Sequence, residues 1–114
     1  MNLLLQAEAL KPQFIYFIET KPNILFDGTF TKVNYCNDFF TMYGVHICID
    51  NVRIDTITRI ELDILNAYSE YIGKPVIKNL RLANDVKLAS CRQLKISGIW
   101  ENNNGEIGLS YKLV

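Results

Sequence analysis

The stretch from Thr58 to Pro75 constrains this chain most, because its start, buried face and end can all be read from its residues. Thr58 and Glu61 have the spacing of a capping box, in which each side chain bonds an unpaired backbone N–H group at the start of a helix. Gly73 suits the left-handed conformation that closes a helix, and Pro75 cannot continue one. These residues predict a helix over residues 59–72.

Apolar residues recur along this predicted helix at spacings of three and four and form one wide stripe. They are Ile60, Ile64, Leu65, Tyr68, Tyr71 and Ile72. Such a stripe is typical of a helix that lies against a sheet. The acids Glu61 and Asp63 are two residues apart and point in different directions, so they do not form a catalytic carboxylate pair.

Most of the chain before and after the helix has the patterns of β-strands. Strands are predicted over residues 14–20, 24–26, 29–36, 39–50 and 76–83, with Val52 and Ile54 extending the fourth. Asp27-Gly28 is typical of a hairpin turn, and Lys21-Pro22-Asn23 and Asn37-Asp38 are further turn signals. Residues 2–10 fit a short helix, and residues 86–91 fit either a helix or a strand.

The last part of the chain predicts a hairpin with one buried face. Apolar residues and glycine alternate with polar ones on both sides of a turn at Asn102–Gly105. The alternating positions are Leu94, Ile96, Gly98 and Trp100 before the turn and Ile107, Leu109, Tyr111 and Leu113 after it.

This order of elements indicates a single globular domain over residues 1–114, of the β-rich α+β class. A chain of 114 residues with 49% hydrophobic and 21% charged residues can form one core of this kind. Two architectures fit the order. One is an open antiparallel sheet with the helix packed on one face. The other is a barrel of the oligonucleotide-binding type, which has three strands, a helix and two strands.

Three cysteines, Cys36, Cys48 and Cys91, are odd in number and widely spaced, which does not suit a disulfide framework. Leu3-Leu4-Leu5 has no basic residue before it and Glu8 soon after it, so neither a signal peptide nor a membrane span is predicted. We therefore expect an intracellular protein, cytoplasmic or nuclear, with free thiols and no membrane partner.

Two stretches of the sequence carry a resemblance. They are FDGTFTKVNYCNDFFTMYGVH over residues 26–46, and LKISGIWE over residues 94–101 continuing to GLSYK over residues 108–112. Both resemble small, poorly characterised proteins of large double-stranded DNA viruses of eukaryotes. Eleven asparagines and fourteen isoleucines indicate an AT-rich coding sequence, which viruses, phages and low-GC bacteria share. The resemblance implies a viral protein that could be packaged in a virion, and it implies no catalytic residue.

Basic residues gather in one part of a chain whose net charge is zero. Residues 74–95 contain six basic residues and one acid, whereas residues 50–70 contain five acids and two basic residues. A basic tract can follow a phosphate backbone, although it can equally be a solvated surface. The candidate phosphate contacts are Lys78, Arg81, Lys87 and Arg92.

Nine of the thirteen aromatic residues lie between Phe14 and Tyr43. Exposed aromatic rings stack with the bases of single-stranded nucleic acid, whereas most aromatic residues fill the core. Tyr35, Phe39 and Tyr43 are the candidate stacking residues, with Lys32 nearby. Phe39 and Phe40 are adjacent, so on a strand one of them faces away from the other and is exposed or meets a partner.

Neither a metal site nor a catalytic motif is indicated. His46 and Cys48 share one face of a predicted strand, and Cys36 and Cys91 could complete a zinc site. No two cysteines have the short spacing of such sites, so buried free thiols are the ordinary interpretation. A cysteine nucleophile activated by His46 lacks a surrounding motif. The chain has no glycine-rich phosphate loop, G-x-S-x-G or H-E-x-x-H, so we expect a non-enzymatic protein without a cofactor.

The sequence therefore favours a small binding protein that contacts nucleic acid, plausibly single-stranded, through the basic tract and the strand aromatics. The alternative is a protein-interaction or virion accessory module that dimerises or binds a host or viral protein. The residues of 39–50 are apolar on both faces, and such a strand could pair at a sheet edge.

Overall fold

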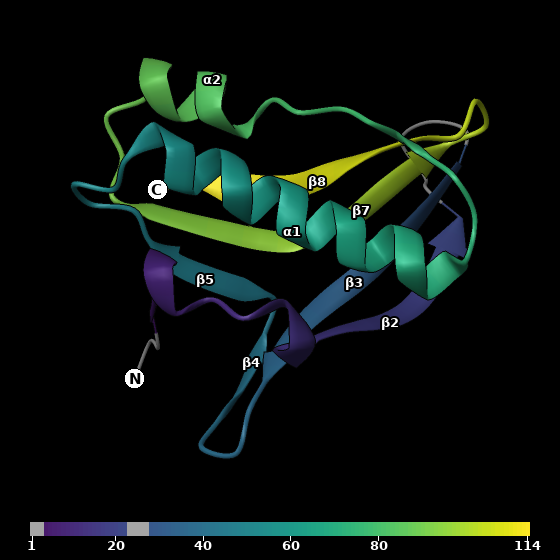
Figure 1. Cartoon of the computed structure of the whole chain (residues 1–114), viewed down its shortest axis with the longest axis horizontal. Coiled ribbons are helices and arrows are strands. Elements are labelled where there is room, and N and C mark those ends of the chain that lie inside the picture. Colours follow the sequence, from purple (N-terminus) through teal and green to yellow (C-terminus); the bar gives the residue numbers. More distant parts are fainter. Residues whose placement is uncertain (1–3, 23–27) are drawn as a thin grey trace.

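The computed structural model describes residues 4–22 and 28–114 of the chain. A curved sheet carries a long helix, α1, along one face and a shorter helix, α2, beside it (Figure 1). The strands are β1 (Leu5–Gln6), β2 (Ile15–Pro22), β3 (Gly28–Cys36), β4 (Thr41–Tyr43), β5 (Val45–Cys48), β6 (Ile77–Lys78), β7 (Gln93–Asn102) and β8 (Glu106–Leu113). The helices are α1 (Ile54–Ile72) and α2 (Leu82–Leu88), with 3-10 turns at Ala7–Ala9 and Pro12–Phe14.

Strand β7 organises the sheet, because it pairs with three other strands. β8 is antiparallel to it along one side, and β5 and β3 share its other side. β2 pairs with β3, β1 adds to β5 in parallel, and β4 pairs with the far end of β3. The path of paired strands ends at β1 and β2. The sheet is therefore open, and the open-sheet alternative describes the fold rather than the barrel.

Helix α1 covers one face of the sheet with the predicted apolar stripe. Its buried apolar residues are Ile57, Ile60, Ile64, Leu65 and Tyr68. The helix ends at Gly73, which is left-handed with φ of +68°, as predicted. Tyr71 is an exception, because it is exposed and contacts the ring of Phe17 at the helix surface. Among the described residues, no helix is long and apolar enough to cross a membrane.

The predicted capping box at the start of α1 is wrong. The helix begins at Ile54, after Arg53, so Thr58 lies inside it and Ile54 does not extend a strand. Ile57 adds one more fully buried residue to the stripe, so burial of the apolar face lengthens the helix towards its N-terminus. Glu61 is buried, and its carboxylate bonds the first residue of a different helix, α2.

Residues 76–83 do not form the predicted half-buried strand. Only Ile77 and Lys78 pair with β8, and Leu82 already belongs to α2. The carboxylate of Glu61 accepts the backbone N–H of Leu82, which satisfies a donor that would otherwise be unpaired at the start of the helix. A buried carboxylate 21 residues earlier in the chain therefore caps the start of this helix.

Helix α2 is also tied to the sheet. The hydroxyl group of Tyr111 in β8 donates a hydrogen bond to the carboxylate of Asp85 in α2. Burial, together with this bond, raises the pKa of Tyr111 above its ordinary value. Residues 86–91, which fit two states in the sequence, are helical as far as Leu88.

The predicted long strand over residues 39–50 is two short strands, β4 and β5, separated by Gly44. Gly44 has φ of +82°, and a Cβ atom there would lie 2.9 Å from the carbonyl oxygen of Ile96. A residue with a side chain would be strained at this position. The break reverses the alternation, so Met42 is buried and Tyr43 is exposed, whereas Val45 is buried again.

The terminal hairpin is confirmed, but the alternation of buried and exposed residues along β7 shifts by one position at Ser97. Leu94 and Ile96 are buried before Ser97, and Ile99 is buried after it. The pairing of β7 with β8 shifts between Ile96 and Gly98, which is the signature of a β-bulge. The bulge turns Trp100 towards the other face of the sheet.

The N-terminal segment differs from its prediction. Instead of a helix over residues 2–10, the described part contains β1 and a 3-10 turn, and Ala7 is fully buried. β2 runs through the predicted turn as far as Pro22. The predicted strand over residues 24–26 and the Asp27-Gly28 turn lie outside or at the edge of the described residues.

Candidate nucleic-acid interface

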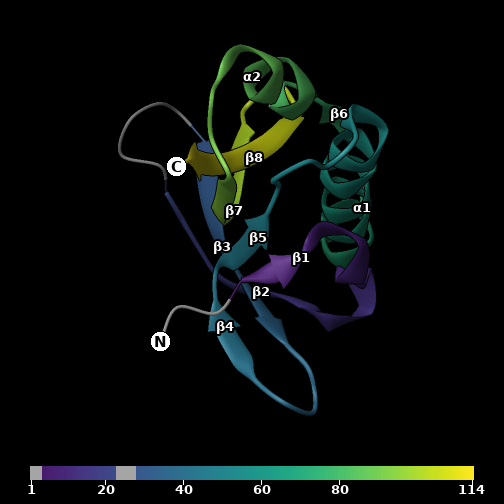
Figure 2. The same cartoon turned by 90° about the vertical axis from the view of Figure 1, so that its left-hand side faces the viewer.

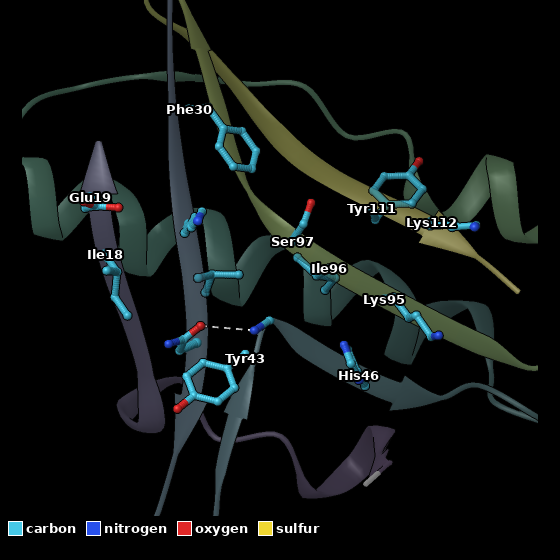
Figure 3. Close-up of a pocket in the computed structure, with 14 residues that line it drawn as sticks. Ile18, Glu19, Phe30, Tyr43, His46, Lys95, Ile96, Ser97, Tyr111 and Lys112 are labelled. Atoms are coloured by element: carbon cyan, nitrogen blue, oxygen red, sulfur yellow. Dashed lines mark hydrogen bonds between the residues drawn. The ribbon is translucent and has the colours of Figure 1, made fainter. Parts of the chain in front are cut away.

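Among the described residues, no helix lies on the face of the sheet opposite α1 (Figure 2). It is hollowed into a cavity of about 660 Å³, drawn in Figure 3. Strands β2, β3, β5, β7 and β8 contribute to its lining, and so does the junction between β4 and β5. Irregular pairing at Glu19 and Ser97 bends two of these strands, because a bulge increases the local twist of a sheet.

One end of the cavity carries a row of three nitrogen-bearing side chains, which we call the cationic row: His46, Lys95 and Lys112. His46 of β5 pairs directly with Lys95 of β7, and Lys95 pairs directly with Lys112 of β8. Side chains paired in this way share one face and have Cβ atoms about 5 Å apart. Burial lowers the pKa of His46, and the positive charge of Lys95 lowers it further.

Among the described residues that line the cavity, the cationic row has no matching row of acids. Across residues 4–22 and 28–114, the ion pairs take Lys21, Arg53, Arg59 and Lys74 as their cations. Glu19 is the carboxylate that lines the cavity, and it pairs with Lys21 at 3.4 Å. Like charges placed directly opposite each other on a sheet destabilise it, so the row favours the arrival of an anion.

Aromatic rings lie on the same face of the sheet. A Cβ atom on Gly98 would lie 2.7 Å from Cζ of Phe30, and one on Gly108 would lie 2.6 Å from Cε2 of Trp100. Each ring therefore lies across a glycine of the neighbouring strand. A methyl group added to that glycine would collide with the ring. Phe30 and Trp100 are themselves a cross-strand pair, and Phe30 lines the cavity.

Tyr43 stands at the mouth of the cavity, with 81% of its surface exposed. Its position is set by Gly44, whose backbone N–H donates to Oδ1 of Asn34 at 3.1 Å (Figure 3). Two residues after Gly44, His46 lies on β5 opposite Lys95 of β7. The ring of Tyr43 is accessible to a planar ligand, whereas its neighbour Met42 is buried in the core.

Tyr43 is therefore the predicted stacking residue that lies in the cavity. Tyr35 is only 1% exposed, so the expectation that it stacks with a base is corrected. Its ring packs between Phe14 and Phe40, and its hydroxyl group accepts the backbone N–H of Lys11 at 3.2 Å. It is a core residue because its position on β3 faces α1.

Phe39 lies in the turn between β3 and β4 rather than on a strand, and 91% of its surface is exposed. The side chain of Asn37 accepts the backbone N–H groups of Phe39 and Phe40, at 2.8 and 3.0 Å. This side-chain turn holds Phe40 against Tyr35 and leaves Phe39 outside. Of the two adjacent rings, one faces the protein and one faces away, as predicted.

The four candidate phosphate contacts of the basic tract are all exposed, and none of them lines the cavity. Lys78 is on β6, Arg81 precedes α2, Lys87 is on α2 and Arg92 precedes β7. Lys95, at the end of the same tract, is the member that reaches the cavity. Proximity in sequence therefore did not identify which basic residues line the cavity.

The sequence places Lys32 near the candidate stacking rings, but it suggests His46 only for a metal or catalytic role. Phe30 and Lys112 are not part of the candidate site predicted from the sequence. The predicted terminal hairpin contained part of the signal, because pairing around the turn at Asn102–Gly105 brings Lys95 close to Lys112. The pairing of β5 and β3 with β7 is not visible in the sequence, since nothing local records which strands become neighbours.

No family model, curated protein or solved structure matches this chain. The cavity is therefore interpreted from its own residues. It combines a cationic row, a further lysine (Lys32) and accessible rings, which suits a ligand that carries both phosphate and a flat ring system.

In the sequence, His46 and the three cysteines are a candidate zinc set, but no metal site is predicted. The three cysteines are free, and Cys36 Sγ lies 3.2 Å from the hydroxyl oxygen of Thr41. Within the part of the chain that the structure describes, no three His, Cys, Asp or Glu side chains are grouped closely enough to hold a metal ion.

Proposed function

We propose that this protein binds single-stranded nucleic acid on the open face of its sheet. The observation that carries the proposal is the meeting, in one cavity, of the cationic row with the accessible rings of Phe30 and Tyr43. Lysine side chains attract phosphate groups, and aromatic rings stack with unpaired bases whatever their sequence.

The layout of the cavity favours a single strand over a duplex. The bases of a duplex are stacked on each other and paired, so they cannot lie flat on Phe30 or Tyr43. A sheet that carries aromatic rings on its open face is a common platform for the splayed bases of a single strand. The cavity of about 660 Å³ has room for such a base beside its phosphate.

The local charge supports the same ligand. The whole chain has zero net charge, yet three lysines, Lys32, Lys95 and Lys112, line this cavity. Its one lining carboxylate, Glu19, is already paired with Lys21. A negative strand therefore meets a positive field at this face, although the protein as a whole is not basic.

Titration of fluorescent single-stranded and duplex DNA and RNA at several salt concentrations tests the proposal. Lys95→Gln and Lys112→Gln are expected to weaken binding of single strands, and each should reduce the slope of log K against log salt by about 0.7. Tyr43→Ala should weaken binding by about 1–3 kcal/mol and leave the slope unchanged.

Lys78→Gln and Arg81→Ala are matched controls, because both side chains are exposed and lie outside the cavity. If these two variants lower the slope and the cavity variants do not, the basic tract is the interface and the cavity is not. If the native protein binds no oligonucleotide even at low salt, the nucleic-acid proposal is wrong.

One observation favours a protein-interaction module as the second candidate. Phe39 stands 91% exposed on the β3–β4 turn beside Asp38, with its backbone N–H bonded to the side chain of Asn37. Edge pairing of residues 39–50 has less support, because β5 already pairs with both β1 and β7. Association seen by sizing chromatography that persists in high salt and disappears in Phe39→Ser would favour this candidate. Viral origin and packaging in a virion stay predictions.

A further inference from the structure

We infer that the cavity recognises the phosphorylated end of a single strand, so that a terminal phosphate monoester, rather than an internal diester, occupies the cationic row. This inference rests on the proposed function and names the part of the strand that the site takes. Its basis is that the three side chains of the cationic row lie together at one end of the cavity.

The geometry brings the three side chains to one place. His46, Lys95 and Lys112 belong to three neighbouring strands and are consecutive in the register of the sheet. In Figure 3 they lie side by side at one end of the cavity, while Ile18, Phe30 and Tyr43 lie towards the other end. One phosphate group placed over Lys95 is therefore within reach of both neighbours.

The charge at the row suits a monoester. An internal phosphodiester carries one negative charge, whereas a terminal phosphate carries about −1.5 to −2 at pH 7 and has three strong acceptor oxygens. Lys95 and Lys112 supply two positive charges, and His46 supplies a further donor. A single diester would neutralise only one of the two lysine charges, whereas the charge of a monoester is enough to neutralise both.

The remaining cation gives the strand a direction. Lys32 pairs with Ile18 on β2 and with Gly98 on β7. It therefore lines the same cavity opposite a point on β7 that is three residues beyond Lys95. With the terminal phosphate at the row, the first base lies against Phe30 or Tyr43, and the next phosphate approaches Lys32. Lys32 is then a contact for an ordinary diester.

Four forms of one oligonucleotide test the inference: a 5′-phosphate, a 3′-phosphate, hydroxyl groups at both ends, and a circle without ends. One of the two phosphorylated forms is expected to bind about tenfold tighter than the hydroxyl form or the circle. This factor corresponds to about one additional hydrogen bond to a charged group.

Variants separate the two lysine roles. Lys95→Gln and Lys112→Gln are expected to abolish the preference for the phosphorylated end, whereas Lys32→Gln should weaken all four forms and keep the preference. Lys112 and Lys32 are exposed and Lys95 is half-buried, and thermal melts confirm that each variant is folded. If all four forms bind equally, the end-recognition inference is wrong and the proposed function stands. If none of them binds, the proposed function fails as well.

Discussion

The carboxylate of Glu61 in α1 accepts the backbone N–H of Leu82, the first residue of α2, at 3.2 Å. The backbone N–H of Arg81 donates to the same carboxylate, also at 3.2 Å. Glu61 is only 2% exposed and Leu82 is fully buried. A buried carboxylate on one helix thus meets the positive end of the other, and it satisfies the buried N–H donor of Leu82.

Glu61→Ala should destabilise the fold, because it leaves the buried N–H of Leu82 without an acceptor. We expect the free energy of unfolding to fall by about 1–3 kcal/mol, the usual cost of an unsatisfied buried donor. Urea denaturation followed by circular dichroism measures this difference. Glu70→Ala is the matched control on the exposed side of α1, and equal stability of the two variants would contradict the role of Glu61.

The contribution of Glu61 to stability depends on pH. Burial raises the pKa of Glu61, and this effect outweighs the opposing hydrogen bonds from Arg81 and Leu82. The folded protein therefore holds the proton more tightly than the unfolded chain does, so the contribution is largest below the ordinary pKa of 4.5 and is lost as pH rises through the folded pKa.

Comparison with Glu61→Gln, which cannot titrate, isolates this effect from that of other carboxylates. As pH falls from about 7 to about 4.5, the stability of the native protein relative to this variant is expected to increase. Urea denaturation at each pH gives the difference. A difference that stays constant with pH would show that the pKa of Glu61 is the same in both states.

Gly108→Ala should destabilise the sheet through the ring of Trp100. The added methyl group would lie 2.6 Å from Cε2 and 2.8 Å from Nε1 of that ring, and overpacking of this kind costs about 1–3 kcal/mol. In a Trp100→Leu background the same change should cost clearly less, since the ring is gone. Equal costs in both backgrounds, measured by urea denaturation, would show that the ring and the glycine are independent.

His46 is the single histidine of the chain, so its proton resonances can be followed without ambiguity by NMR. Burial and the charge of Lys95 hold its pKa below 6.5 in the free protein. The charged and titratable groups of the neighbouring strands include Lys95, Lys112, Lys32, Glu19 and Tyr43. A bound phosphate opposes the lysine charges, so the pKa of His46 should rise when a saturating single strand is added. An unchanged pKa would place the phosphate elsewhere, and chloride at equal ionic strength is the control.

Several elements could be read from local sequence. The stripe from Ile60 to Tyr68, the left-handed Gly73 and the turn at Asn102–Gly105 are all where the pattern placed them. Each depends on residues within a few positions of one another. The start of α1 was misread because Thr58 and Glu61 match a local motif, whereas the carboxylate is used by a helix that follows much later in the chain.

Little of the candidate site could be read in this way. Tyr43 was identified as a stacking candidate, although Gly44 rather than a regular strand turns it outward. Tyr35 was placed in the site, because a strand residue gives no sign of which of its two faces a helix will cover. The basic tract was defined by proximity in sequence, but its members fall on or beside different elements, β6, α2 and β7, and only Lys95 of the tract is among the residues that line the cavity.

The sequence by itself determined which segments of this protein bury an apolar face and where the final hairpin turns, because periodicity and turn chemistry act over a few residues. Only the tertiary structure decided that β5 pairs with the other side of β7 and that α1 leaves the outer face of β5, β7 and β8 open. The hairpin turn brings Lys95 beside Lys112, whereas His46 joins them through strand pairing between distant segments. That pairing is selected by the packing of the whole core rather than by any residue near His46.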